Sequence, residues 1–270
     1  MQNTTPLPLI SIVMSVYNET ESRLKSAIEH ILNQTYKSFE FIIINDASSP
    51  YIETLLESYQ SPKIIIIKNE TNLGLTQSLI KGISTASGKY IARIDSDDYC
   101  LPDRLEKQLN FMENNPEYVL CGSNYEEIFN NIKTSPKVKL ISNYKNIQKS
   151  LSSFNPFAHS TLFFRKDAYD QIGGYNPNIR YAQDYDLNIR LLKIGKGENL
   201  NDVLVVRNID ANCISMKKAK AQKLSALKTM THAYILHGGG IKFLYYYVKT
   251  LTSLIYPYSR RFKLNTQEIK

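Results

Sequence analysis

The sequence contains few cysteines and no long hydrophobic run. No stretch of its 270 residues reaches the roughly eighteen consecutive apolar residues that indicate a membrane-spanning helix. Residues 1–19 have no basic segment ahead of their short apolar stretch, so no secretory signal peptide is predicted. The three cysteines, Cys100, Cys121 and Cys213, are odd in number and form no CxxC pair, which argues against a disulfide framework. We therefore expect a protein of the reducing cytoplasm.

Glycine-rich motifs for nucleotide binding are also missing. No GxGxxG follows a predicted strand, and no GxxxxGK[ST] occurs anywhere in the chain. Neither a dinucleotide-binding fold nor a P-loop is therefore supported. The segment HGGG at 237–240 follows a helical pattern, and we expect it to end a helix.

Acidic residues are nearly absent from the last fifth of the chain. The net charge is +8, but residues 217–270 hold 11 Lys and Arg against one acid, Glu268, whereas residues 1–216 hold 22 basic and 24 acidic residues. The chain is long enough for one domain of about 200 residues plus an appendage. The basic character belongs to the appendage.

The first half of the chain alternates apolar, β-rich runs with segments of helical periodicity. This alternation predicts βαβ units around a mainly parallel sheet, and hence an α/β fold. The unbroken isoleucine run within 39–46 indicates a strand buried on both faces. The predicted strands are 9–16, 39–46, 63–69 and 89–94, and the predicted helices are 24–32, 51–59, 75–84 and 103–114.

The second half of the chain is less regular and contains no internal repeat. The predicted elements are strands at 119–123, 161–165 and 203–207, a helix at 183–193, a polar loop at 130–139 and a helical, basic tail.

Polar clusters follow three of the predicted strands. Residues 17–19 follow the first strand, 46–48 the second and 95–98 the fourth. In open α/β sheets ligands bind just beyond the carboxyl ends of the strands, so we expect these clusters to converge on one edge. Glu19 and Asp46 are each interpreted either as a helix cap or as part of a ligand site there.

Three carboxylates crowd the turn after the fourth strand. Asp95, Asp97 and Asp98 lie between that strand and a helix that Pro102 opens. One interpretation is a solvated turn with an aspartate that caps the helix. The other is a divalent cation site, because two carboxylates spaced i, i+2 can share Mg²⁺ or Mn²⁺ with water and substrate phosphates, which relieves their repulsion. The position at the sheet edge favours the cation site.

Further polar positions have two interpretations each. Asn72 and Gly74 form a predicted turn, and Lys81 is either solvated or a counter-charge for nearby phosphates. Asp184 opens the helix predicted at 183–193, where it is either a helix cap or a general base.

The ordered motifs resemble those of the family 2 glycosyltransferases, which are inverting enzymes of the GT-A fold that use nucleotide-activated sugars. The resemblance runs from Leu9 to Ser215. It is carried by the order and spacing of SVYNE (15–19), INDASS (44–49), NLGLTQSLIKG (72–82), GKYIARIDSDD (88–98), LPDRLEKQ (101–108), HSTLFFR (159–165), GGY (173–175) and AQDYDLNIRL (182–191).

The resemblance implies a nucleotide site with a metal ion. Tyr17, Glu19 and Asp46 would line the pocket for the base and the ribose. Asp95 would contact ribose or metal-bound water, and Asp97 would ligate Mn²⁺ or Mg²⁺ on the diphosphate.

The resemblance also implies the catalytic base, Asp184, which would deprotonate the acceptor hydroxyl as it attacks the anomeric carbon. Inversion at that carbon is the expected outcome. The other residues assigned to the nucleotide-sugar are Asn72, Gly74, Lys81 and Ser96.

One segment departs from the family's pattern. Family members often carry a segment similar to YRVHENSIS after the last core strand, with a histidine near the diphosphate, whereas residues 207–215 are RNIDANCIS. Asp210 takes the place of that histidine and is either an additional metal ligand or a surface loop residue.

The basic tail interleaves lysines with aromatic residues, as in FLYYYVKTLTSLIYPYSRR at 243–261. No nucleic-acid recognition motif accompanies it, so we predict no nucleic-acid partner. A basic, aromatic helix can lie on an anionic membrane surface, and the alternative is packing on the core or contact in a dimer. We predict a catalytic domain at 1–215 and a helical extension at 216–270.

The leading hypothesis is a hexosyl- or hexosaminyltransferase of bacterial surface polysaccharide synthesis, such as that of lipopolysaccharide or capsule. The donor would be a nucleotide-diphosphate sugar and the acceptor a glycan, one linked to lipid, in the cytoplasm or at the inner face of the cytoplasmic membrane. A sugar nucleotidyltransferase is an alternative, but it would carry a glycine-rich loop after the first strand, and SVYNETESR contains no glycine. A catalytically silent binding module is opposed by the filled base and metal positions.

Overall fold

The computed structural model describes residues 9–129, 132–209 and 219–255. Within them, the first half of the chain alternates strands and helices as the periodicity predicts, with one short, unpredicted strand, β5. Its elements are β1 (Ile10–Val16), α1 (Glu21–Leu32), β2 (Phe39–Asn45), α2 (Pro50–Glu57), β3 (Ile64–Lys68), α3 (Leu75–Ser84), β4 (Tyr90–Arg93), β5 (Tyr99–Cys100) and α4 (Arg104–Asn114).

The second half adds the rest of the sheet and two C-terminal helices. Its elements are β6 (Tyr118–Phe129), β7 (Ile132–Val138), α5 (Tyr144–Ser150), the 3₁₀ helix η1 (His159–Thr161), β8 (Phe163–Arg165), α6 (Lys166–Gln171), α7 (Gln183–Ile194), β9 (Lys196–Ile209), α9 (Ala219–His237) and α10 (Ile241–Ile255).

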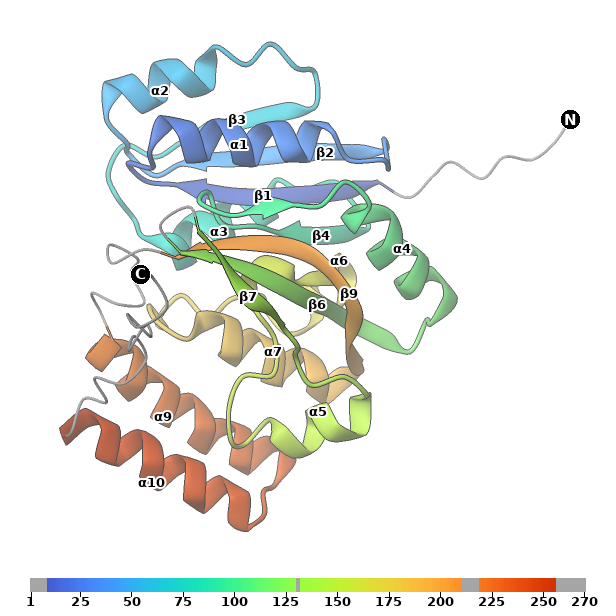
Figure 1. Cartoon of the computed structure of the whole chain (residues 1–270), viewed down its shortest axis with the longest axis vertical. Helices are drawn as coiled ribbons and strands as arrows, with labels where there is room; N and C mark the ends of the chain where they lie inside the picture. Colours follow the sequence, from blue (N-terminus) through green and yellow to red (C-terminus); the bar gives the residue numbers. More distant parts are fainter. Residues whose placement is uncertain (1–8, 130–131, 210–218, 256–270) are drawn as a thin grey trace, which may run out of the picture.

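In the described residues the strands form one sheet in the order β3-β2-β1-β4-β8-β6-β9-β5, and β7 pairs with β6 outside that path (Figure 1). β3, β2, β1 and β4 are parallel, with Val16 opposite Asn45 and Val13 opposite Arg93. The carboxyl ends of β1, β2 and β4 therefore lie on the same edge, as predicted. β8 is antiparallel to both β4 and β6, so the sheet as a whole is mixed.

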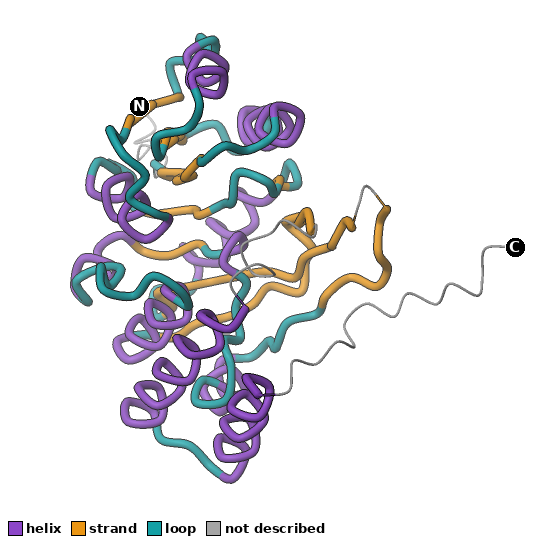
Figure 2. The backbone as a smooth tube through the Cα atoms, turned by 90° about the vertical axis from the view of Figure 1, so that its left-hand side faces the viewer, coloured by secondary structure: helices purple, strands orange, loops and turns teal. Residues whose placement is uncertain are grey.

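Two hydrophobic clusters cover the two faces of the sheet. Because side chains alternate along a strand, Met14 of β1 lies in one cluster and its neighbour Val13 in the other. α1, α2 and α4 bury their apolar residues in the first cluster, and α3, α5, α6 and α7 in the second. β2 is buried on both faces, as its isoleucine run predicts. Figure 2 shows these layers from the side.

One local prediction for the second half is wrong, and two predicted strands are shorter than the observed ones. Residues 132–138 are predicted as part of a polar loop but form β7, which pairs antiparallel with β6. Strands at the outside of a sheet accommodate charged residues and proline, so the polar composition around Pro136 does not prevent pairing. The strands predicted at 119–123 and 203–207 are parts of the longer β6 and β9, which support each other by parallel pairing.

The tail is helical, as predicted, and its first helix packs on the body. Leu227, Met230 and Ala233 of α9 are buried in the same cluster as Leu187 and Ile189 of α7. α9 ends at His237, before the glycines that were expected to terminate it, and α10 lies beside α9 (Figure 1). No helix in the described part of the chain is both long and apolar enough to cross a membrane. The division into 1–215 and 216–270 stays a prediction.

Candidate active site

The loops at the carboxyl edge of the sheet are tied to one another. Ser48 Oγ, after β2, accepts a hydrogen bond from the backbone N–H of Asn18, after β1, at 3.1 Å. Asn18 Oδ1 accepts in return from the backbone N–H of Ser49 at 2.8 Å. Asn18 and Ala47 have positive φ angles of 49° and 58°, a backbone conformation that non-glycine residues adopt only where the surroundings hold it. Hydrogen bonds between the turns therefore hold this edge of the sheet in a defined conformation.

Asp46 is buried and holds the turn that contains Asn72 and Gly74. Its Oδ1 accepts hydrogen bonds from the Leu73 backbone N–H and from Asn69 Nδ2, both at 2.8 Å, and its Oδ2 accepts from the Gly74 N–H at 2.9 Å. Asn72 Nδ2 donates to the Asp46 carbonyl at 3.3 Å. Gly74 has a φ of 84°, which favours glycine. The structure thus gives Asp46 a positioning function beside its predicted contact with the nucleotide.

Lys81 lies behind this turn. Its Nζ donates to Asn69 Oδ1 at 2.8 Å and to the Lys68 carbonyl at 3.0 Å. Because Asn69 also donates to Asp46, the ammonium group belongs to the same network. Its role toward phosphate stays a prediction.

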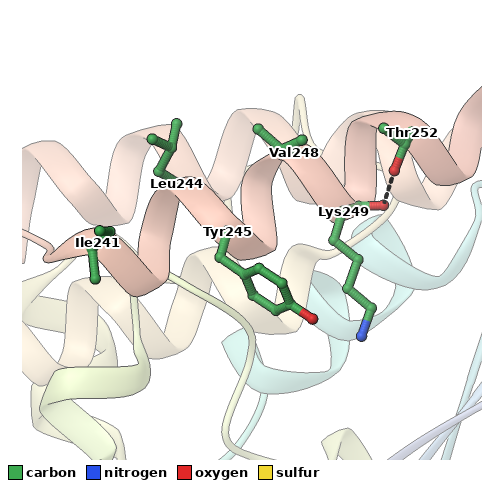
Figure 3. Close-up of a pocket in the computed structure, with 6 residues that line it drawn as sticks. All are labelled: Ile241, Leu244, Tyr245, Val248, Lys249 and Thr252. Carbon is green, nitrogen blue, oxygen red and sulfur yellow. Dashed lines mark hydrogen bonds between the residues drawn. The ribbon is translucent and has the colours of Figure 1, made fainter.

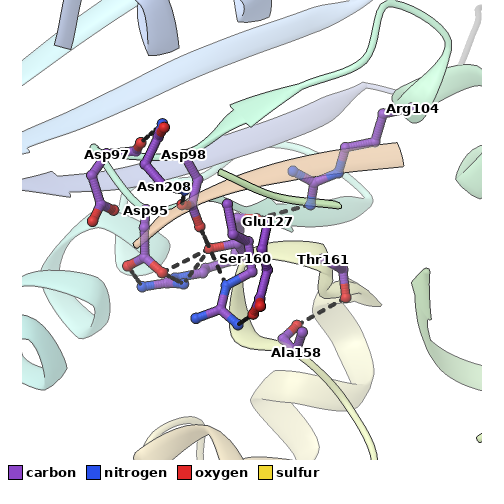
Figure 4. Close-up of polar contacts among 11 residues, drawn as sticks. Asp95, Asp97, Asp98, Arg104, Glu127, Ala158, Ser160, Thr161 and Asn208 are labelled. Carbon is purple, nitrogen blue, oxygen red and sulfur yellow. Dashed lines mark hydrogen bonds and ion pairs between the residues drawn. The ribbon is translucent and has the colours of Figure 1, made fainter. Parts of the chain in front are cut away.

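The three acids after β4, Asp95, Asp97 and Asp98, form one acidic cluster (Figure 4). Each places a carboxylate oxygen within 4.8 Å of an oxygen of the other two. Asp98 is buried, whereas Asp95 and Asp97 are partly exposed, and Ser96 lies in the turn between them. The sequence-based prediction that these acids share one site is consistent with this geometry.

A buried arginine holds Asp95. Arg93 of β4 is 1% exposed and donates through both terminal nitrogens to the Asp95 carboxylate, with Nη1 2.6 Å from Oδ2. Ser160 Oγ donates to the same Oδ2 at 2.7 Å. Burial by itself raises the pKa of Asp95, but the Arg93 guanidinium outweighs it and holds that pKa well below its usual range. Asp95 is therefore a fixed, charged carboxylate.

Ser160 links Asp95 to Asp98. Its Oγ lies 2.7 Å from Asp95 Oδ2 and 2.5 Å from Asp98 Oδ2. One hydroxyl has one hydrogen, so Ser160 can donate to only one of the two carboxylates at a time. Burial, followed by repulsion from Asp95, raises the pKa of Asp98 to about 6, so Asp98 takes up a proton more readily than Asp95 does. The Asn208 N–H donates to Asp98 Oδ1 at 2.9 Å, and Arg207 Nε lies 3.8 Å from Oδ2.

Asp97 is partly exposed, and the neighbouring charges that act most strongly on it are all negative. Burial, followed by repulsion from Asp98, Asp95 and Glu19, raises its pKa to about 8. A divalent cation would stabilise the charged form that this arrangement disfavours. The donors of the cluster are carboxylate oxygens, the ligand type that Mg²⁺ and Mn²⁺ prefer. The residues present therefore fit a hard divalent cation.

Glu19 borders the acidic cluster, and Tyr17 lies in the same loop after β1. Glu19 is close enough to raise the pKa of Asp97, and its Oε1 accepts from the Thr20 N–H at 2.8 Å. The Tyr17 side chain is 54% exposed, so its ring is accessible to a ligand. Their predicted contacts with base and ribose stay predictions.

Asp184 lies in the first turn of α7, after Ala182 with a positive φ of 59°. Asn155 Nδ2 donates to Asp184 Oδ2 at 2.8 Å. Burial raises the pKa of Asp184, while Arg93 and Asp95 act on it in opposite directions. Asp184 is therefore beside the acidic cluster, with a proton affinity shifted toward that of a general base.

Sequence reasoning missed several residues that build this site. His159 Nε2 lies 2.7 Å from the Tyr175 hydroxyl, and burial and the nearby Arg93 lower the pKa of His159, so it is neutral. A charged Arg93 within an apolar strand was a usable signal, because a buried arginine needs a carboxylate partner. Ser160 and Asn155 offered no comparable signal. Asp210, the predicted additional metal ligand, lies outside the described residues.

Residues 11–173, more than half of the chain, match the family described as Glycosyl transferase family 2. The chain is 36% identical over 233 residues to the uncharacterized glycosyltransferase MJ1057 of Methanocaldococcus jannaschii, which covers 83% of this chain and 79% of the relative. It is 29% identical over 257 residues to the amylovoran biosynthesis glycosyltransferase AmsE of Erwinia amylovora, covering 92% of this chain and 94% of AmsE.

Among solved structures, the fold is similar to that of TarS from S. aureus, residues 1–349, in complex with UDP-GlcNAc. The TM-score is 0.72 at 15% sequence identity, over 96% of this chain and 77% of that chain. At this identity the likeness concerns the fold, and it confirms the predicted GT-A architecture. The match over residues 11–173 and the 36% identity to MJ1057 show that the chain is a glycosyltransferase that belongs to family 2.

Proposed function

We propose that this glycosyltransferase transfers a hexosyl or hexosaminyl group from a nucleotide-diphosphate sugar to a hydroxyl of a glycan acceptor, with inversion at the anomeric carbon. The observation that carries the proposal is the juxtaposition of a fixed carboxylate, Asp95, an open one, Asp97, and a buried one with raised pKa, Asp184. The first two suit a metal-bound diphosphate, and the third suits a general base.

The donor end of the site would be built by the turns at the sheet edge. Tyr17, Glu19 and Ser96 line its open side, and the turn held by Asp46 closes the other side. TarS has been crystallised with UDP and with UDP-GlcNAc, which supports a nucleoside diphosphate sugar as the donor class here. Mn²⁺ or Mg²⁺, held by Asp97 with help from Asp95, would supply positive charge for the leaving diphosphate.

The acceptor end would be served by Asp184. Its carboxylate takes the proton of the acceptor hydroxyl while the hydroxyl oxygen forms a bond to the anomeric carbon. The bond from that carbon to the diphosphate oxygen breaks, and its electron pair leaves with the nucleoside diphosphate. Attack from the face opposite the leaving group inverts the configuration at that carbon.

We place this reaction in the assembly of a bacterial cell-surface polysaccharide such as lipopolysaccharide or capsule. AmsE is named for amylovoran biosynthesis and is similar over nearly the whole chain, which supports a glycan acceptor. The proposed acceptor is lipid-linked, so the proposed enzyme would work as a peripheral protein at the inner face of the cytoplasmic membrane.

The direct test is release of nucleoside diphosphate from a panel of nucleotide-diphosphate sugars in the presence of Mn²⁺. We expect release from one donor class, with loss of activity when Mn²⁺ is chelated. Asp184→Asn should lower the rate by about 10²- to 10⁴-fold, the usual contribution of a general base, and should still bind the nucleotide with Mn²⁺. Asp97→Ala should lose the Mn²⁺-dependent part of nucleotide binding in calorimetric titrations.

The matched control is Asp170→Asn, which removes an exposed carboxylate paired with Lys166 outside the site and should leave rate and binding unchanged. Full activity of both Asp97→Ala and Asp184→Asn would overturn the assignment of the site. No release from any donor, together with no Mn²⁺-dependent nucleotide binding, would favour a silent binding module.

A further inference from the structure

α10 presents an apolar face to the outside of the molecule. Its residues recur at intervals of three and four, which places them on one side of the helix. We call this set the outer face, and it consists of Ile241, Leu244, Tyr245, Val248 and Leu251, with exposed fractions of 87%, 59%, 61%, 46% and 46%. Four of them line an open depression along the helix together with Lys249 and Thr252 (Figure 3).

The opposite side of α10 fixes the helix to the body. The Phe243 ring stacks on Tyr234 of α9 with centroids 4.5 Å apart, and Tyr246 lies 5.4 Å from Phe154. Lys223 of α9 donates to the Ser253 carbonyl at 2.9 Å. α10 therefore has two apolar sides, one packed and one exposed, and the exposed side is held in a defined orientation.

The charges around the outer face are of one sign. Residues 219–255, which form α9 and α10, contain five lysines and no acid. Lys242 and Lys249 are exposed, are seven residues apart and so lie along the same rim of the outer face. Lys249 Nζ lies 5.8 Å from the centre of the Tyr245 ring, and both side chains extend to the same side in Figure 3.

We propose that the outer face of α10 docks on an anionic lipid bilayer, with the helix axis in the plane of the interface. The aliphatic side chains would enter the boundary between headgroups and acyl chains. Tyr245, with an apolar ring and a polar hydroxyl, suits the headgroup level, and Lys242 and Lys249 would face lipid phosphates. The inference rests on the proposed function, in which the acceptor is lipid-linked, and adds the surface by which the enzyme reaches that acceptor.

A second copy of the chain is a poorer match for the same face. A two-fold contact is self-complementary, so it would bring the two lysine-bearing rims together. Neither α9 nor α10 supplies an acid to pair with them. An anionic bilayer complements both the apolar face and its charge.

The test is binding of the whole protein to vesicles of phosphatidylcholine alone and of phosphatidylcholine mixed with phosphatidylglycerol, measured by co-sedimentation. We expect binding to the anionic vesicles, weakened at least about ten-fold by Leu244→Glu/Val248→Glu, because two carboxylates would enter the apolar boundary. Lys242→Gln/Lys249→Gln should weaken it about five-fold for each lysine. The matched control is Ile65→Glu/Ile66→Glu, which adds the same charges at exposed isoleucines of β3 and should bind as the wild type does.

The outcomes separate this inference from the proposed function. Release of nucleoside diphosphate from the sugar donor, measured without vesicles, should be the same in wild type and in the α10 variants, because Leu244 and Val248 lie outside the candidate active site. Equal vesicle binding by wild type and Leu244→Glu/Val248→Glu would overturn the inference while leaving the proposed chemistry intact. A wild-type dimer in sedimentation velocity that this variant converts to a monomer would also overturn it, in favour of a second copy.

Discussion

At the scale of single residues, two amide side chains determine how the Asp184 carboxylate is oriented. Asn188 Nδ2 donates to Asn155 Oδ1 at 3.0 Å. Because the Asn155 oxygen accepts this hydrogen bond, the amino group of Asn155 faces Asp184. That amino group donates to Asp184 Oδ2 and so fixes the orientation of the carboxylate. Asn155 is therefore a positioning residue for the proposed base.

Asn155→Ala should lower kcat by about ten-fold, since a hydrogen bond to a charged group is worth about 1.5–3 kcal/mol, and should leave the KM for the donor nearly unchanged. Removing a donor from a carboxylate disfavours its charged form, so the acid limb of the kcat profile should move to higher pH. The measurement is the pH dependence of sugar transfer for Asn155→Ala. Asn114→Ala, at an exposed asparagine that ends α4, is the control. An unchanged acid limb would contradict this role of Asn155.

At the scale of elements, the turn at 72–74 depends on a carboxylate from another strand. Asp46 follows β2, and it satisfies the N–H groups of Leu73 and Gly74 at the start of α3. The helix start, with its unpaired N–H groups, favours an acid at this position. The end of β2 and the start of α3 are thus held together by one carboxylate.

Asp46→Asn should lower the free energy of unfolding by about 1–3 kcal/mol, because one amide oxygen cannot accept from all three donors and leaves one of them without its acceptor. Chemical denaturation would measure this change. Asn72→Ala, which removes only a 3.3 Å hydrogen bond, should stay within about 0.5 kcal/mol of the wild type. An unchanged denaturant midpoint for Asp46→Asn would mean that Asp46 does not stabilise the turn and acts only on the ligand.

The packing and pairing of the elements also explain which parts of the fold could be predicted from the sequence. Apart from β5, the elements from β1 to α4 follow from local periodicity, because the strands are apolar runs and each helix buries one apolar side. β7 could not be predicted, since a polar segment around Pro136 becomes a strand only through its pairing with β6. Asp95, Asp97 and Asp184 could be located because strand ends and helix starts place them. Asn155 and Ser160 could not, since their roles arise where the 150–160 segment meets β4 and α7.

At the scale of the whole molecule, the two hydrophobic clusters join the tail to the body. Leu227 and Met230 of α9 contribute to the cluster that supports α7, the helix that bears Asp184. α9 therefore shares a core with the body of the protein. If α10 docks as proposed, α9 would connect the membrane surface to the helix of the catalytic base through packed side chains.

The acidic cluster also links the stability of the whole molecule to pH. The raised pKa values of Asp97, about 8, and Asp98, about 6, mean that the folded protein binds protons that the unfolded chain releases above its usual carboxyl pKa of 3.8. The free energy of unfolding should therefore fall as pH rises from about 4 to 8. Asp95, whose pKa is lowered, contributes in the opposite sense, and its stabilisation is lost only as pH falls below 3.8.

Thermal unfolding of the metal-free protein should show this fall as a decrease of several degrees in Tm between pH 5 and pH 8, since about 1 kcal/mol moves the midpoint of a protein of this size by about 2–4 °C. Mn²⁺ should raise Tm more at pH 8 than at pH 5, because the cation binds the charged carboxylates and competes with protons at lower pH. Asp97→Asn should flatten the metal-free dependence and abolish the response to Mn²⁺. Asp202→Asn, at an exposed acid paired with Lys107, should behave as the wild type does. A wild-type pH dependence in Asp97→Asn would mean that Asp97 does not hold the extra proton, and the cation would then have to be assigned to other ligands.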